Sequence, residues 1–156
     1  MDLDELEATA YHEAGHLAAR LLLGGRIMFV TIQPDPFGRT YGRVVPDYRV
    51  LLPKSHQIVI ALAGPMAERR FRAGDEPTGD QGDWDRAIRD AFRIAKGDME
   101  QASALLDKLE GKASILVNTY WPAIERTASA LLVFGRLDGD TACRQASGIW
   151  HPIGVG

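Results

Sequence analysis

Two histidines and a glutamate within residues 11–16, Tyr-His-Glu-Ala-Gly-His, have the types and the spacing of a metal site. His12 and His16 are four positions apart, so on an α-helix they lie one turn apart on the same face, with Glu13 beside them. Neutral imidazole nitrogens are good ligands for Zn²⁺, and a neighbouring carboxylate is suited to deprotonating a water molecule. The motif therefore predicts one zinc ion per chain, bound by His12 and His16, with Glu13 as the catalytic base.

A catalytic zinc site needs a third protein ligand and leaves the fourth position for water. Spacing alone does not select this ligand among the candidates of suitable type, which are His56, Glu68, Asp80, Asp83, Asp85 and His151. Asp83 stands where the N-cap of a predicted helix belongs. Its carboxylate is therefore expected either to bind the metal or to accept a hydrogen bond from the first turn of that helix.

Other classes of zinc protein are disfavoured by the surrounding residues. The metzincin pattern requires Gly three positions and His six positions after the second His, where this chain has Ala19 and Leu22. The deaminase pattern requires H-x-E and a downstream P-C-x-x-C, which the sequence lacks. A closed structural zinc site usually includes several Cys ligands, and Cys143 is the only cysteine in the sequence.

The histidine pair lies in a predicted amphipathic helix over residues 3–23, where apolar residues recur every three or four positions. Asp4, with Glu7 three positions later, predicts the cap at its start. Gly24 is expected to end the helix, because glycine readily adopts a positive φ. Such a helix presents both imidazoles on one face.

Residues 27–32 and 41–45 are short β-branched and aromatic runs, which predict an antiparallel hairpin with a long irregular loop. Further helices are expected over residues 53–71, 83–95 and 98–131, the last with a break near residues 118–121 because Pro122 does not fit inside a helix. The predicted fold class is mainly α with a small antiparallel sheet (α+β), with four or five helices. Residues 1–156 are expected to form a single domain, in which residues 137–156 are a short C-terminal segment that is expected to be mobile.

The composition fits one globular domain and disfavours several partners. The 156 residues include 18 Lys and Arg, 21 Asp and Glu and no basic cluster, which argues against nucleic acid. The longest uncharged apolar stretch, residues 58–67, is about half of the roughly 20 residues that a membrane span needs. With no secretory signal, a cytoplasmic location is expected. The Arg-rich stretches at residues 68–70 and 86–93 are interpreted as solvated helix faces.

Five blocks occur in order along residues 8–96: AYHEAGH, VTIQP, YGRVVP, ALAGPMAE and TGDQGDWDRA. In order and spacing they resemble the zinc peptidase domain of the FtsH family of ATP-dependent proteases. The resemblance implies an FtsH peptidase-like helical fold with a zincin-type H-E-x-x-H helix, and the activity of a zinc metalloendopeptidase. It also implies that His12, His16 and Asp83 bind zinc and that Glu13 is the base. Glu68 is then the runner-up ligand, or a group that hydrogen-bonds the ligands from outside.

The sequence also departs from that family, because it contains no G-x-x-x-x-G-K-[ST] phosphate loop. We therefore expect a stand-alone relative without the AAA ATPase module and the membrane helices, which hydrolyses unfolded peptide or protein without ATP. A separate ATPase or a homo-oligomer is a possible partner. Strand 41–45 is a candidate to pair with an extended substrate, and Tyr11 to assist the reaction.

A different class of function stays open at this point. The chain could be a non-catalytic zinc-binding module for interaction or regulation, with its long C-terminal helices as the docking surface. An accessible zinc site beside Glu13 favours the enzyme, whereas an occluded site favours the binding module.

Overall fold

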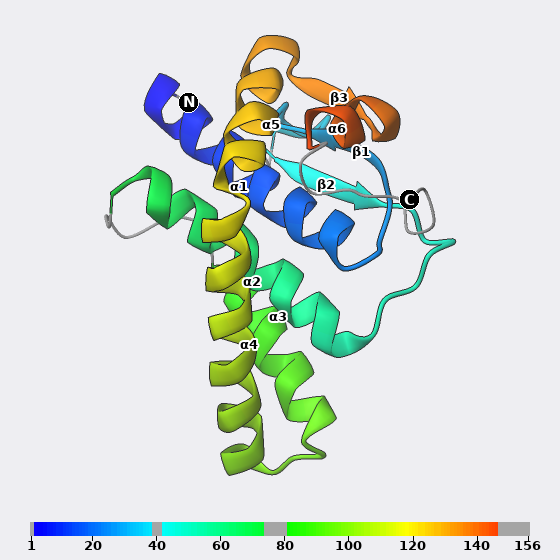
Figure 1. Cartoon of the computed structure of the whole chain (residues 1–156), viewed down its shortest axis with the longest axis vertical. Coiled ribbons are helices and arrows are strands. Elements are labelled where there is room, and N and C mark those ends of the chain that lie inside the picture. The colour runs from blue at the N-terminus through cyan, green and yellow to red at the C-terminus, as the bar shows by residue number, and fades with distance from the viewer. Residues whose placement is uncertain (1, 39–41, 74–80, 147–156) are drawn as a thin grey trace.

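Helices dominate the computed structural model, and a small sheet lies at one end of the molecule (Figure 1). The model describes residues 2–38, 42–73 and 81–146. Its elements, in order, are α1 (Leu3–Leu22), β1 (Ile27–Thr31), β2 (Arg43–Pro46), α2 (Lys54–Phe71), α3 (Gln81–Ile94), α4 (Met99–Thr119), α5 (Trp121–Phe134), β3 (Arg136–Asp138) and α6 (Gly139–Gln145). The predicted class, mainly α with a small antiparallel sheet, is confirmed.

The N-cap of helix α1 lies two residues before the expected one. Asp2, and not Asp4, is the N-cap, and its Oδ1 accepts a hydrogen bond from the backbone N–H of Glu5 at 2.8 Å. Asp2 and Asp4 are each followed by a glutamate three positions later, and the first of these two pairs, Asp2 with Glu5, forms the cap. The helix ends as expected, because Gly24 follows it with a φ of 91°.

Small residues bring α1 and α2 close together at the centre of the molecule. A Cβ added to Gly15 would stand 2.5 Å from the carbonyl oxygen of Ala63 and 2.7 Å from the Cβ of Ala67. Helix α5 packs on another side of α1, so α1 is enclosed. The largest fully buried side chains around it include Leu17, Ile58, Leu62, Ile124 and Leu131.

The sheet has the order β2-β1-β3, and both pairs of strands are antiparallel. Val30 in the central strand is buried and pairs with Val44 on one side and Leu137 on the other. The predicted hairpin is therefore present, although residue 41, where its second strand was expected to begin, lies outside the described residues. Within the described part of the chain, β2 is an edge strand.

Part of the C-terminal segment that was expected to be mobile, residues 137–156, forms regular elements. Strand β3 pairs with β1, and α6 follows it directly. Asp138 caps α6 by accepting a hydrogen bond from the backbone N–H of Thr141 at 2.8 Å. The remaining part of the segment predicted to be mobile, residues 147–156, lies outside the described residues.

The other predicted helices are present with small shifts of their ends. Helix α2 follows Pro53, and Tyr120 separates α4 from α5 at the expected break. Helix α3 begins at Gln81, which puts Asp83 inside the first turn and not at the N-cap position. In the described residues no helix has both the length and the apolar character needed to cross a membrane.

Candidate metal centre

Two residues of α1 and one of α3 bring their ligand atoms to one point. Nε2 of His12 lies 3.0 Å from Nε2 of His16, and Oδ2 of Asp83 lies 2.9 Å from the first nitrogen and 3.3 Å from the second. In the described part of the chain, His12, His16 and Asp83 form a group whose ligand atoms lie close enough together to hold one metal ion. The juxtaposition matches the residues that the resemblance implied.

The opposite nitrogen of each imidazole faces an acceptor that fixes its proton. Nδ1 of His12 donates to Oε2 of Glu68 at 2.8 Å, and Nδ1 of His16 donates to the carbonyl oxygen of Ile60 at 2.7 Å. In a neutral imidazole the other nitrogen then carries a lone pair. Two Nε2 lone pairs and a carboxylate oxygen therefore point at each other, an arrangement that needs a cation or a proton between them.

The spacing of these three atoms fits a zinc ion. Ligand atoms about 2.0–2.1 Å from Zn²⁺ at tetrahedral angles are about 3.3 Å from one another. The three distances in this structure are 2.9, 3.0 and 3.3 Å. Two imidazoles and one carboxylate are also a usual donor set for zinc in enzymes, so the residues present fit the metal.

Glu68 lies behind His12, outside the group of three. One of its oxygens accepts from Nδ1 of His12, and the other accepts from Nε of Arg72 at 3.0 Å. Both oxygens of this buried carboxylate are therefore engaged. Of the two roles left open for Glu68, the geometry favours the one in which it orients a ligand.

The electrostatics of the metal-free site favour a proton on His12. Burial lowers the pKa of His12, but hydrogen bonds to Asp83 and Glu68 outweigh it and raise the pKa from 6.5 to about 10. Burial raises the pKa of Asp83, but hydrogen bonds from His12 and His16 bring it well below its ordinary value. Two carboxylates thus create a strong local preference for positive charge.

Glu13 is buried beside the group of three, with 6 % of its surface exposed. Burial is the largest cause that raises the pKa of Glu13, and the carboxylates of Asp83 and Glu68 raise it further, against the two histidines. A raised pKa suits a group that takes up a proton and returns it. Glu13 also touches Gly42, just before β2, where an added Cβ would lie 2.7 Å from Oε1 of Glu13.

A glycine of α2 makes room for the second histidine. A Cβ on Gly64 would stand 2.4 Å from both Cε1 and Nε2 of His16, which is closer than real Cβ contacts occur. The sequence alone did not identify Gly64 as a neighbour of this imidazole. The same holds for Gly42 and Arg72, whose contacts depend on helices and strands far apart in the sequence.

Other candidates from the sequence lie elsewhere. Asp85 accepts a hydrogen bond from Gln81 on the surface of α3, and His56 does not belong to the group of three. The ring of Tyr11 stacks between Phe71 and Trp121, with ring centroids 4.4 and 5.3 Å away, so its role is packing. Asp80 and His151 lie outside the described residues.

Comparison with known proteins finds a similar protein for part of the chain. The chain is 42 % identical over 89 residues to a protein of Pelobacter propionicus named ATP-dependent zinc metalloprotease FtsH. Part of this chain is related to FtsH. The match covers 53 % of this chain and 14 % of that FtsH protein, so the chain spans a small part of the relative's length. No family model matches the chain.

Proposed function

We propose that this chain is a zinc-dependent metalloendopeptidase that binds one zinc ion through His12, His16 and Asp83. The observation that carries the proposal is the convergence of three lone-pair atoms, with both imidazole tautomers fixed from behind, next to the buried carboxylate of Glu13. The relation of part of the chain to FtsH, a protein named as a zinc metalloprotease, supports the same chemistry.

The side chains divide the work of peptide hydrolysis among them. Zinc, when bound, supplies a Lewis acid that polarises a carbonyl and lowers the pKa of water to about 7. Glu13 accepts the proton of the attacking water and returns it to the leaving amine, which its raised pKa favours. Glu68 keeps the Nδ1 proton on His12, so that Nε2 stays available as a ligand atom.

The partial exposure of the three ligand side chains supports access of a substrate to the site. The side chains of His12, His16 and Asp83 are each 12 or 13 % exposed. Ligands that are partly exposed favour an enzyme over a zinc-binding module with an occluded site. Hydrolysis in this proposal needs no ATP, and a separate ATPase or a second copy of the chain is a candidate partner for folded substrates.

We further propose that the substrate is an unfolded peptide or protein segment that adds to β2. In the described part of the chain β2 has one neighbouring strand, β1, so its other edge offers backbone hydrogen-bonding groups. Gly42 precedes β2 and touches Glu13, so a peptide on that edge would pass close to the base. Recognition through backbone groups selects for extended chains more than for sequence.

Replacement of the base tests this proposal. Glu13→Gln preserves shape and removes the proton acceptor, so we expect it to retain zinc and to lose cleavage of an unstructured peptide. Glu5→Gln, at an exposed position of the same helix, is the matched control and should cleave like the wild type. Equal turnover of Glu13→Gln and wild type would overturn the mechanism. A zinc-loaded wild type without any cleavage would instead favour the non-catalytic zinc module.

A further inference from the structure

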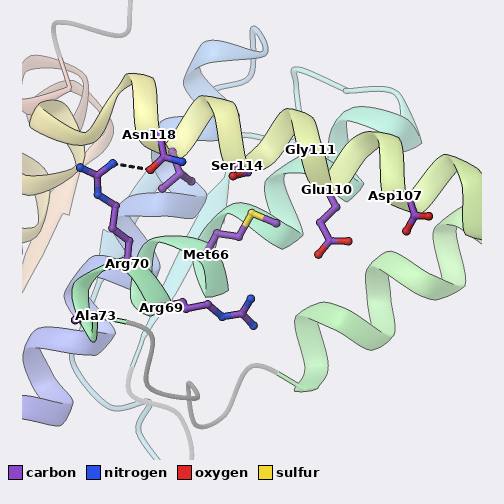
Figure 2. A pocket seen from close by; sticks show the side chains of 10 residues that line it. Met66, Arg69, Arg70, Ala73, Asp107, Glu110, Gly111, Ser114 and Asn118 are labelled. Atoms are coloured by element: carbon purple, nitrogen blue, oxygen red, sulfur yellow. Dashed lines mark hydrogen bonds between the residues drawn. The ribbon is translucent and has the colours of Figure 1, made fainter.

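A hollow lies between α2 and α4, and none of the metal-centre residues lines it. This hollow, here called the α2–α4 hollow, has a volume of about 610 Å³. Figure 2 shows the side chains that both helices direct into it. Its volume is in the range of sites for small ligands. The lining residues used below are Met66, Arg69, Arg70, Asp107, Glu110 and Asn118.

The two walls of the hollow carry opposite charges. Arg69 extends into it from α2, and Glu110 extends into it from α4 (Figure 2), and both side chains belong to half-buried residues. No hydrogen bond or ion pair within the described residues satisfies either of them. Arg69 was expected on a solvated helix face, but its side chain extends into the hollow. Half-buried charges without partners are suited to a ligand that brings both counter-charges.

A neighbouring arginine is already held in place. Nη1 of Arg70 donates to Oδ1 of Asn118 at 2.6 Å, and its guanidinium lies over the ring of Trp121, 4.4 Å from the centroid. In Figure 2 the Arg70 side chain points toward Asn118 and away from that of Arg69, so Arg69 presents the guanidinium that is free to bind a carboxylate.

The opposite wall and the floor complete the ligand's chemistry. Asp107 lies one helical turn before Glu110, so two carboxylates line the α4 side and suit an ammonium group. Met66 contributes an apolar surface between the walls. A ligand that matches these walls has a carboxylate at one end, an ammonium group at the other and an apolar side chain between them. A short peptide with both termini free has these three features.

We propose that the α2–α4 hollow binds short peptides with free termini, the carboxylate at Arg69 and the ammonium at Glu110 and Asp107. This inference goes beyond the proposed hydrolysis and uses none of the metal-centre residues. It therefore stands or falls separately from that activity.

The test uses the tripeptide Ala-Leu-Ala together with its N-acetylated and its C-amidated forms, each of which lacks one terminal charge. Binding is followed by NMR shifts of backbone amides in the full chain carrying Glu13→Gln, so that the peptide is not hydrolysed. Ala-Leu-Ala should shift amides of α2 and α4. Each blocked form should bind about fivefold more weakly, because charge-assisted hydrogen bonds to partly exposed groups are of moderate strength.

Two variants assign each end of the peptide to its wall. In Arg69→Gln, amidation of the peptide should no longer weaken binding, and in Glu110→Gln, acetylation should no longer weaken it. Arg89→Gln and Glu100→Gln are exposed matched controls outside the hollow and should respond like the parent chain. Glutamine is a good helix former, so all four variants preserve the helices.

Three results would overturn the proposal. The first is the absence of shifts in α2 and α4 at peptide concentrations up to about 10 mM, which corresponds to negligible affinity. The second is equal binding of the free, acetylated and amidated peptides. The third is a response of Arg69→Gln and Glu110→Gln that matches the response of the two controls. The first two results do not depend on any substitution in the hollow.

Discussion

Glu68 of α2 accepts a hydrogen bond from Nδ1 of His12 in α1 at 2.8 Å, although 56 positions separate the two residues. The same carboxylate accepts from Arg72 one helical turn later. A line of three side chains thus runs from the surface of α2 to the metal centre. It determines which nitrogen of His12 faces the other ligand atoms.

This line predicts a graded loss of zinc affinity. Glu68→Ala frees the Nδ1 proton and the ring, so the affinity should fall by about 10–100-fold, as is usual when such partners are removed. Arg72→Ala leaves Glu68 in place and should cost less. In the Glu68→Ala background, Arg72→Ala should have no further effect, because its contact with the line is gone. Competition with a chelator measures the zinc affinity of all three variants. If the losses of affinity in the two single variants add up in the double variant, this line of contacts is contradicted.

Gly64 is expected to be essential for the position of His16. Gly64→Ala places a methyl group against the imidazole, so the ring must move and the zinc affinity should fall by at least about tenfold. Gly111→Ala is a matched control in α4, because its added Cβ meets no atom within 4 Å. That control should keep zinc and raise the free energy of unfolding by about 0.5–1 kcal/mol. Equal zinc binding by the two variants would refute the packing argument.

Gly42 is expected to affect catalysis without affecting the metal. A Cβ there would contact Oε1 and Cγ of Glu13 and the methyl group of Thr9, so Gly42→Ala should displace the base. Zinc content should stay at the wild-type level, because the three atoms nearest to the added Cβ belong to Glu13 and Thr9 and not to a metal ligand. Cleavage of an unstructured peptide should fall by about tenfold or more, since a misplaced base loses its contribution. Unchanged cleavage would show that Glu13 acts from another position.

Zinc binding should release a proton, and its affinity should rise with pH. In the metal-free chain the pKa of His12 is raised to about 10, so its imidazole is protonated at pH 7, whereas a ligand must be neutral. The pKa of Asp83 is lowered, so its carboxylate is already ionised. At pH values below the raised pKa of His12, the affinity for zinc should therefore increase about tenfold per pH unit. Calorimetry in buffers of different ionisation enthalpy measures the released proton, and a pH-independent affinity would contradict this assignment.

Much of the fold could be predicted because its signals are local. Gly24 ends α1, Pro53 precedes α2, and Asp98 caps α4 by accepting from the backbone N–H of Gln101 at 3.1 Å. Each of these residues acts within one turn of its own position. Strand β3 has only three residues and exists through its pairing with β1, more than a hundred positions earlier, so no local pattern announced it.

The candidate site shows the same division between local and distant signals. The spacing of His12 and His16 on one helix could be predicted from the helical period. The choice between metal ligand and helix cap for Asp83 could not, because it depends on where α3 begins and how it approaches α1. Helix α3 begins at Gln81, so Asp83 is free of the cap position and its Oδ2 faces both imidazoles.

The most direct test of the metal centre is the zinc content of the purified full chain, measured for wild type and for Asp83→Ala. Asp85→Ala is the matched control, since Asp85 is exposed in the same helix. We predict about one zinc ion per chain for wild type and for Asp85→Ala, removable by a chelator, and its loss in Asp83→Ala. A wild type that binds no zinc, or an Asp83→Ala variant with wild-type zinc content and affinity, would contradict the account.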